Sequence, residues 1–188
     1  MLYVKTLKYG FYVITHPFDG FWGLRREGKG SVAAAVTFVA LTILTFTIEK
    51  QNTGFLFNTN RLSELNVTVD IITVAMLYVL WCVANWCTTS LMDGKGRMQD
   101  ILIAAGYSLL PFILLRLPMV VMSHMIRLSE GSFYYVLGTV SWLWAVFLIF
   151  TGTMVIHQYS VKKTIFTCLI TIAGMGILLF IGLLFFNV

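Results

Sequence analysis

Two charged residues, Asp70 and Arg116, lie within long apolar stretches of this sequence and are the first candidates for chemistry. A charge in the middle of a bilayer costs at least about 2.5 to 3.5 kcal/mol, so each residue needs a partner or a route to water. Because both are expected near the same end of neighbouring antiparallel helices, we predict an ion pair between them. The alternative is that each side chain reaches the headgroup layer independently.

A second group of candidates surrounds residues 93–115, where a short charged loop leads into an apolar helix. Its members are small or polar: Asn85, Gly94, Gly96, Gly106, Tyr107, Ser108 and Pro111. Pro111 lacks the N–H that would bond to the carbonyl of Tyr107, so a kink is predicted there. We predict that Asn85 joins two helices by contacting Tyr107 or Ser108, whereas the alternative is a polar path through the membrane.

The histidines and cysteines form no pattern typical of a metal or redox site. His16, His124 and His157 are expected at different depths, although a bis-histidine haem needs two at the same depth. The three cysteines all lie in apolar runs and are predicted to be small core residues: Cys82, Cys87 and Cys168. The sequence also lacks the common nucleotide-binding, hydrolase and zinc-protease motifs. We therefore predict no catalytic residue, no cofactor, no metal and no enzymatic activity.

The composition indicates an all-α integral membrane protein. The 188 residues are 59% hydrophobic and 11% charged, whereas soluble domains are about 25% charged. The mean hydropathy is +0.86. Crossing about 30 Å of hydrocarbon takes about 20 helical residues. Five stretches meet this requirement and define a membrane domain over 31–188, with predicted spans at about 31–48, 67–92, 100–122, 133–158 and 164–187.

The first thirty residues, 1–30, mix aromatic and basic side chains and are predicted to form an amphipathic interfacial segment before the first span. The favoured role is an anchor that orients this span, and the alternative is a surface that docks a partner. Nine of the thirteen Lys and Arg residues are expected on the side of the N-terminus: Lys5, Lys8, Arg25, Arg26, Lys29, Lys95, Arg97, Lys162 and Lys163. The positive-inside rule then predicts a cytoplasmic N-terminus and an external C-terminus. It also explains the net charge of +5 without a nucleic-acid partner.

The third span resembles a known family. The segment GKGRMQDILIAAGYSLLPFILL is similar to the signature of the Yip family, the Ypt- and Rab-interacting proteins and their bacterial relatives. A glycine-containing cytoplasmic loop is followed there by Gly-Tyr-Ser-x-x-Pro, which is represented here by Gly106, Tyr107, Ser108 and Pro111. The resemblance implies five spans. This sequence shows neither the long cytosolic N-terminal region nor the Asp-Leu-Tyr-Gly-Pro motif of the trafficking members. The resemblance is therefore to compact bacterial members and does not imply Rab binding.

Three functions remain open on the sequence. The leading one is a non-catalytic polytopic scaffold or accessory protein in the bacterial cytoplasmic membrane. It would organise or assist another integral membrane protein, and the resemblance suggests a sugar-uptake transporter. The alternative is a small transporter or channel subunit in which Pro111 breaks a helix beside Asn85, Tyr107 and Arg116. A lipid-handling or membrane-shaping protein is the third. Besides the lipid bilayer and such a partner, a homo-oligomer is left open.

Overall fold

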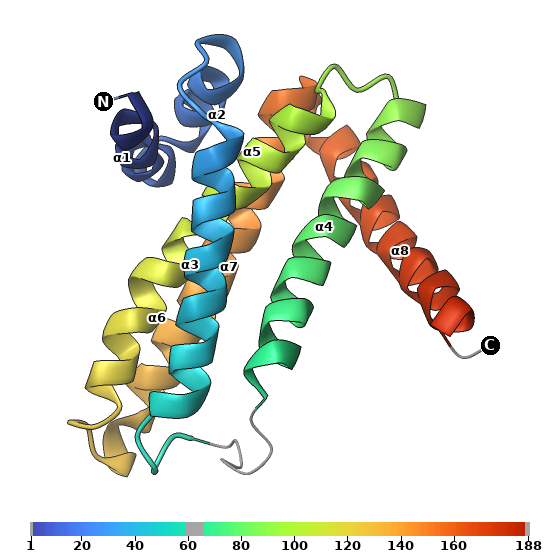
Figure 1. Cartoon of the computed structure of the whole chain (residues 1–188). Helices are drawn as coiled ribbons and strands as arrows, with labels where there is room; N and C mark the ends of the chain where they lie inside the picture. The colour runs from blue at the N-terminus through green and yellow to red at the C-terminus, as the bar shows by residue number, and fades with distance from the viewer. Residues whose placement is uncertain (1, 59–65, 187–188) are drawn as a thin grey trace.

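The chain is helical throughout the residues that the structure describes, 2–58 and 66–186 of a computed structural model (Figure 1). The helices follow in the order α1 (Leu2–Thr15), α2 (Pro17–Arg26), α3 (Val32–Asn52), α4 (Val67–Leu91), α5 (Met98–Ser108), α6 (Leu110–Met122), the short 3-10 helix η2 (Leu128–Glu130), α7 (Gly131–His157) and α8 (Val161–Phe186). Within these ranges, five stretches are long and apolar enough to cross a membrane: α3, α4, α5 with α6, η2 with α7, and α8. The predicted all-α class with five candidate spans is confirmed.

The first span is longer than the sequence suggested, because α3 continues beyond Ile48 to Asn52. It begins at Ser31, whose side chain accepts a hydrogen bond from the N–H of Ala34 at 3.1 Å. Its extension carries Glu49 and Lys50, and both side chains find partners on neighbouring helices. Ion pairing allows these two residues to remain helical at the end of an apolar segment.

The third span is broken at Leu109, as Pro111 predicts. Helix α5 ends at Ser108 and α6 begins at Leu110, which places Pro111 in the first turn of α6. A proline is tolerated in a first turn because the N–H that it lacks would have no partner inside the helix. The N–H of Leu109 turns back to the carbonyl of Gly106 at 3.2 Å. The break therefore changes the helix direction while satisfying the backbone around it.

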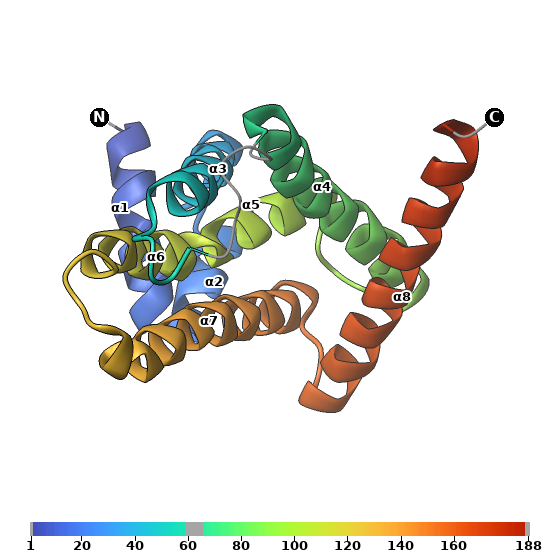
Figure 2. The same cartoon turned by 90° about the horizontal axis from the view of Figure 1, so that it is seen from below.

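Helices α3, α5, α6 and α7 pack together, and α1 and α2 close one end of this bundle (Figure 1). The main core cluster joins α1 and α2 to the bundle through buried residues that include Val13, Phe21, Phe38 and Leu148. Helix α4 packs on α3 and α5, while α8 packs chiefly on α4 and diverges from the rest of the molecule (Figure 2). Helix α8 is therefore the most peripheral of the spans.

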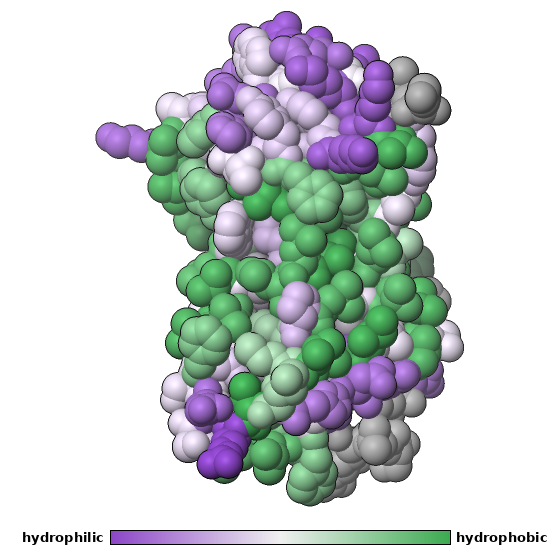
Figure 3. Space-filling model, turned by 90° about the vertical axis from the view of Figure 1, so that its left-hand side faces the viewer, coloured by the Kyte–Doolittle hydropathy of each residue, from purple (hydrophilic) through white to green (hydrophobic). Residues whose placement is uncertain are grey.

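Hydrophobic and hydrophilic residues are distributed over the surface as expected for a membrane protein. Figure 3 shows a hydrophobic belt between two hydrophilic ends. We call the end formed by α1, α2, the α4–α5 loop and the α7–α8 loop the basic end, because it carries the nine cations named above. The loops meet there through Lys95, whose Nζ donates to Oε1 of Gln158 at 2.9 Å. Exposed aromatic side chains of α1 and α2, including Phe11, Phe18 and Trp22, border this end.

Candidate functional site: the junction at the basic end

The two glycines of the α4–α5 loop lie directly against His157, the last residue of α7. A Cβ atom at Gly94 would lie 2.5 Å from Nδ1 of His157 and 2.8 Å from the hydroxyl of Tyr159. A Cβ atom at Gly96 would lie 2.8 Å from Cε1 of His157. Both distances are too short for any residue with a side chain. The glycines therefore let the loop pack closely on the end of α7.

His157 is the central residue of this junction, a role that its position in the sequence does not indicate. Its side chain is only 1% exposed, and its Nδ1 accepts a hydrogen bond from the N–H of Gly96 at 3.3 Å. A neutral imidazole that accepts at Nδ1 carries its proton on Nε2. Nε2 is buried and has no hydrogen-bond partner among the described residues. Because a buried unpaired donor costs about 1 to 3 kcal/mol, this N–H is a strong candidate for a bound water.

Arg25 of α2 closes the junction from the N-terminal segment. Its Nη1 donates to the carbonyl of Ile156, and its Nη2 donates to the carbonyl of Lys95 at 2.7 Å. Its Nε lies 4.0 Å from a carboxylate oxygen of Asp100, the residue that also accepts the N–H of Arg97 at 3.0 Å. Burial lowers the pKa of Arg25, and the charge of Asp100 opposes this effect. One guanidinium thus holds α2, the α4–α5 loop, α5 and α7 together.

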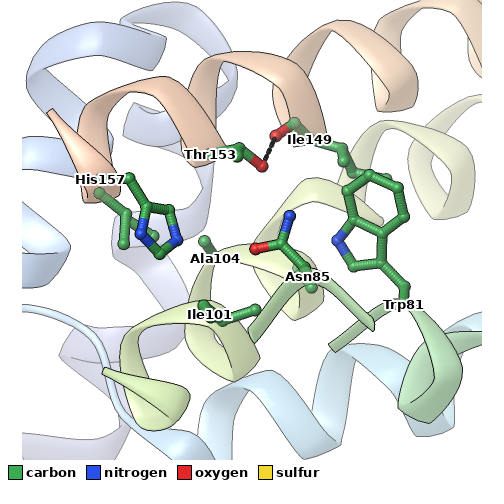
Figure 4. A pocket seen from close by; sticks show the side chains of 9 residues that line it. Trp81, Asn85, Ile101, Ala104, Ile149, Thr153 and His157 are labelled. Atoms are coloured by element: carbon green, nitrogen blue, oxygen red, sulfur yellow. Dashed lines mark hydrogen bonds between the residues drawn. The ribbon is translucent and has the colours of Figure 1, made fainter. Parts of the chain in front are cut away.

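A small polar cavity lies beneath this junction, between α4, α5 and α7 (Figure 4). Its volume is about 10 Å³, which is room for about one water molecule. Asn85, Thr153 and His157 line it together with Trp81 and apolar residues of α5. Figure 4 shows the side chains of Asn85 and His157 extending into the same space from different helices. A water there would satisfy the Nε2–H of His157.

The predicted contact of Asn85 with Tyr107 or Ser108 is wrong. Nδ2 of Asn85 lies 3.5 Å from Oγ1 of Thr171 on α8, a weak hydrogen bond that links α4 to α8. The hydroxyl of Tyr107 donates to the carbonyl of Thr6 on α1 at 2.9 Å, and Ser108 donates to the carbonyl of Ala104 at 2.8 Å. Tyr107 lies roughly 200° around α5 from Ala105, which lines the cavity, so it faces α1 instead.

Gly106 has the role that its size predicts. A Cβ atom at this position would lie 2.7 Å from Cβ and 2.8 Å from Cα of Ala35. Helix α5 therefore touches α3 at backbone distance, and the small residues at the start of α3 make this approach possible. Tyr107 packs beside this contact, edge-on to Phe38 with ring centroids 5.0 Å apart. The Gly-Tyr-Ser-x-x-Pro segment thus joins α5 to α3 and α1.

The predicted ion pair of Asp70 with Arg116 is also corrected. Asp70 is 3% exposed and pairs with Nζ of Lys50 at 2.6 Å. Arg116 pairs with Glu49, and its Nε donates to Oγ of Ser141 at 2.9 Å. Both partners lie in the α3 extension, beyond the predicted end of the first span at residue 48. The two predicted residues therefore meet adjacent side chains of α3 rather than each other.

The chemistry of the described residues is that of hydrogen bonds, ion pairs and close packing. Within residues 2–58 and 66–186, no group of three or more His, Cys, Asp and Glu residues is placed to hold a metal ion. A family model described as the Yip1 domain matches residues 11–183, from α1 to α8. No curated protein and no solved structure matches the chain.

Proposed function

The chain belongs to the Yip1 domain family, and from this premise we propose that it is a non-catalytic membrane scaffold or accessory protein that assists another integral membrane protein. The observation that carries the proposal is the arrangement of α8. This helix uses one side to pack on α4 and leaves its remaining apolar surface for a partner. The contacts at the basic end support the same view, since the side chains of Arg25 and Lys95 and the N–H of Gly96 each bond one element to another.

Helix α8 has a distinct contact side made of threonines. Thr164, Thr167 and Thr171 are all 0% exposed, and each donates its hydroxyl to a backbone carbonyl four residues earlier. Thr167 and Thr171 also contact Met92 and Asn85 of α4. Side chains with satisfied hydroxyls and little bulk allow close packing between membrane helices. These threonines therefore lie on the side of α8 that packs on α4.

The other sides of α8 expose a continuous run of large apolar residues, including Phe166, Leu169, Ile177 and Phe180. In a bilayer such a surface is satisfied by lipid, and a second membrane protein can replace that lipid by shape-complementary packing. Gly176 adds a place of close approach, because a Cβ there would meet no atom within 4 Å. This exposed side is the docking surface that we propose for the partner.

The junction at the basic end gives the scaffold its organising surface. We propose that this end faces the cytoplasm, because the Lys and Arg residues gather there. In this orientation, α1 and α2 lie at the inner headgroup layer with Phe11, Phe18 and Trp22 exposed, and the C-terminus is external. We further propose a compact bacterial-type member in the cytoplasmic membrane, with a transporter subunit such as one for sugar uptake as the partner.

Photo-crosslinking from α8 tests the proposal. A photoreactive phenylalanine analogue is placed at Phe180, which is 63% exposed on α8, or at the matched control Phe147, which is 48% exposed on α7. We expect one integral membrane protein, identified by mass spectrometry, to crosslink at Phe180 and not at Phe147. Identical products at the two positions would contradict the docking surface. A crosslink to a second copy of this chain would show that the exposed side of α8 forms a homo-oligomer instead of binding a different protein. Solute flux by the purified chain in liposomes would favour the transporter alternative.

A further inference from the structure

Two large cavities, both open to the surface of the molecule, lie next to each other between the helices, away from the basic end. The first, which we call the polar chamber, has a volume of about 460 Å³ and lies between α3, α6 and α7. The second, the apolar chamber, has a volume of about 420 Å³ and lies between α3, α4, α5, α6, α7 and α8. The two share Phe46, Phe112 and Trp142 in their walls. The two cavities therefore adjoin at these three aromatic side chains and have different chemistries.

The apolar chamber suits a hydrocarbon chain. Its wall includes Val74, Leu77, Leu109, Ala145, Ile149 and Met175. The hydroxyls of Thr42 and Thr73 also border it, but both are bonded to backbone carbonyls of their own helices, at 2.8 Å and 2.7 Å. A volume of this size without polar partners is not a favourable place for water. The surface of the apolar chamber therefore favours an apolar ligand.

The polar chamber carries paired charges at the opposite end of the molecule. Arg116, Glu49 and Lys50 line it, and Lys50 also pairs with Asp70. The described hydrogen bonds of Arg116 use three N–H groups, while a guanidinium has five. Lys50 and Arg116 can thus donate further hydrogen bonds to a phosphate. Because two carboxylates balance the two cations, the charges complement a headgroup that carries both signs.

The basic end closes this series of cavities. The apolar chamber shares Trp81, Ala105 and Ile149 with the small junction cavity, whose volume is about 10 Å³. Asn85 and His157 lie in the wall of that cavity. A headgroup does not fit through a space that holds about one water. The junction cavity therefore offers a headgroup no passage toward the basic end.

We propose that these two chambers bind one zwitterionic glycerophospholipid of the ethanolamine class. Its acyl chain occupies the apolar chamber between α4 and α7, and its phosphate accepts hydrogen bonds from Arg116 and Lys50. Its ammonium group lies near Glu49, which supplies the matching negative charge. This site goes beyond the proposed accessory function, because it assigns a specific lipid to the interior of the fold. The bound lipid would fill the space between α4 and the other helices.

The test uses two matched valine substitutions on α4. Val74→Trp fills the apolar chamber, whereas Val79→Trp places the same side chain at a position that is 52% exposed and faces outward. Each full-length protein is purified in detergent, incubated with an equimolar mixture of phosphatidylethanolamine and phosphatidylglycerol, and examined by native mass spectrometry. We expect one ethanolamine lipid per chain in the unmodified protein and in Val79→Trp, with at least a tenfold loss in Val74→Trp.

A second variant tests the headgroup contact independently of the cavity. Lys50→Gln with Asp70→Asn removes both members of a partly buried ion pair and leaves neither residue as an unpaired charge. We expect this double variant to retain a lipid while its preference for ethanolamine over glycerol headgroups falls at least fivefold. The proposal is overturned if the unmodified protein retains no lipid or prefers phosphatidylglycerol. It is equally overturned if Val74→Trp, shown to be folded by size exclusion, binds as much lipid as Val79→Trp. Occupancy of the site by a helix of a partner protein would also overturn it.

Discussion

Substitution of Gly106 tests the closest helix contact in the fold. In Gly106→Ala, the new Cβ would lie 2.7 Å from Cβ, 2.8 Å from Cα and 2.9 Å from the carbonyl oxygen of Ala35. Ordinary carbon contacts are about 3.5 to 4.0 Å, so α3 and α5 must separate by roughly 1 Å. Two of the three atoms belong to the backbone and cannot rotate away. The variant therefore has to move a helix rather than a side chain.

The expected magnitude follows from two opposing effects. Overpacking costs about 1 to 3 kcal/mol. Because the neighbour at Gly106 is the rigid backbone of α3, we expect a cost in the upper part of this range, about 2 to 3 kcal/mol. Alanine recovers about 1 kcal/mol through its greater helix propensity. We therefore expect Gly106→Ala to lower the free energy of unfolding by about 1 to 2 kcal/mol. The control, Gly176→Ala on α8, meets no atom within 4 Å and should raise it by about 0.5 to 1 kcal/mol.

The difference in the free energy of unfolding is measured by unfolding both variants reversibly with sodium dodecyl sulfate in mixed micelles. Tryptophan fluorescence follows the unfolding. The two variants should differ by about 1.5 to 3 kcal/mol, with opposite signs relative to the unmodified protein. If Gly106→Ala were as stable as Gly176→Ala, the close approach of α3 and α5 would be refuted. The explanation of the Gly-Tyr-Ser-x-x-Pro segment as a helix joint would then have no basis.

Three further predictions concern individual contacts. Glu49→Gln should destabilise the protein by about 1 to 3 kcal/mol, because Arg116 loses its carboxylate partner. The double variant Glu49→Gln with Arg116→Gln should lose less stability in the same unfolding assay, and equal losses would contradict the pairing. Tyr107→Phe should lower the free energy of unfolding by about 1 kcal/mol and increase amide hydrogen exchange in α1, because it removes the hydrogen bond to Thr6. Unchanged exchange in α1 would argue against the attachment of α1 to α5 through this hydrogen bond. Burial raises the pKa of Tyr159 above its ordinary 10.0, so the contribution of this side chain to stability is present below pH 10 and is lost as the pH rises further. Tyr159→Phe should therefore reduce the loss of stability between pH 9 and 11. An identical pH profile in this variant would exclude the ionisation of Tyr159 as the cause of that loss.

The sequence was a good guide to the helices and to local backbone effects. Apolar length gave the five spans, and the steric rules for proline and glycine gave the break before Pro111 and the close contact at Gly106. These features depend on a residue and its immediate neighbours in the chain. The sequence likewise marks Gly94 and Gly96 as candidates, although it does not show that both pack against His157.

The side-chain partners could not be predicted in the same way. Asp70 and Arg116 were expected to pair because Glu49 and Lys50 were assigned to a loop, although both lie on the last turn of α3. The predicted neighbour of Asn85 is wrong, because the rotation of α4 about its axis depends on its packing against α8. His157 and Arg25 meet only after α2 folds onto the end of α7. Such contacts depend on tertiary arrangement rather than on spacing.

The most direct test of the central claim is native mass spectrometry of complexes released from membranes of cells that make the full chain. We predict a stoichiometric complex with a second integral membrane protein. The complex should be lost in Phe180→Asn on the exposed side of α8 and retained in the control Phe147→Asn on α7. A chain that is released alone, or a complex that survives Phe180→Asn unchanged, would contradict an accessory protein that docks its partner through α8.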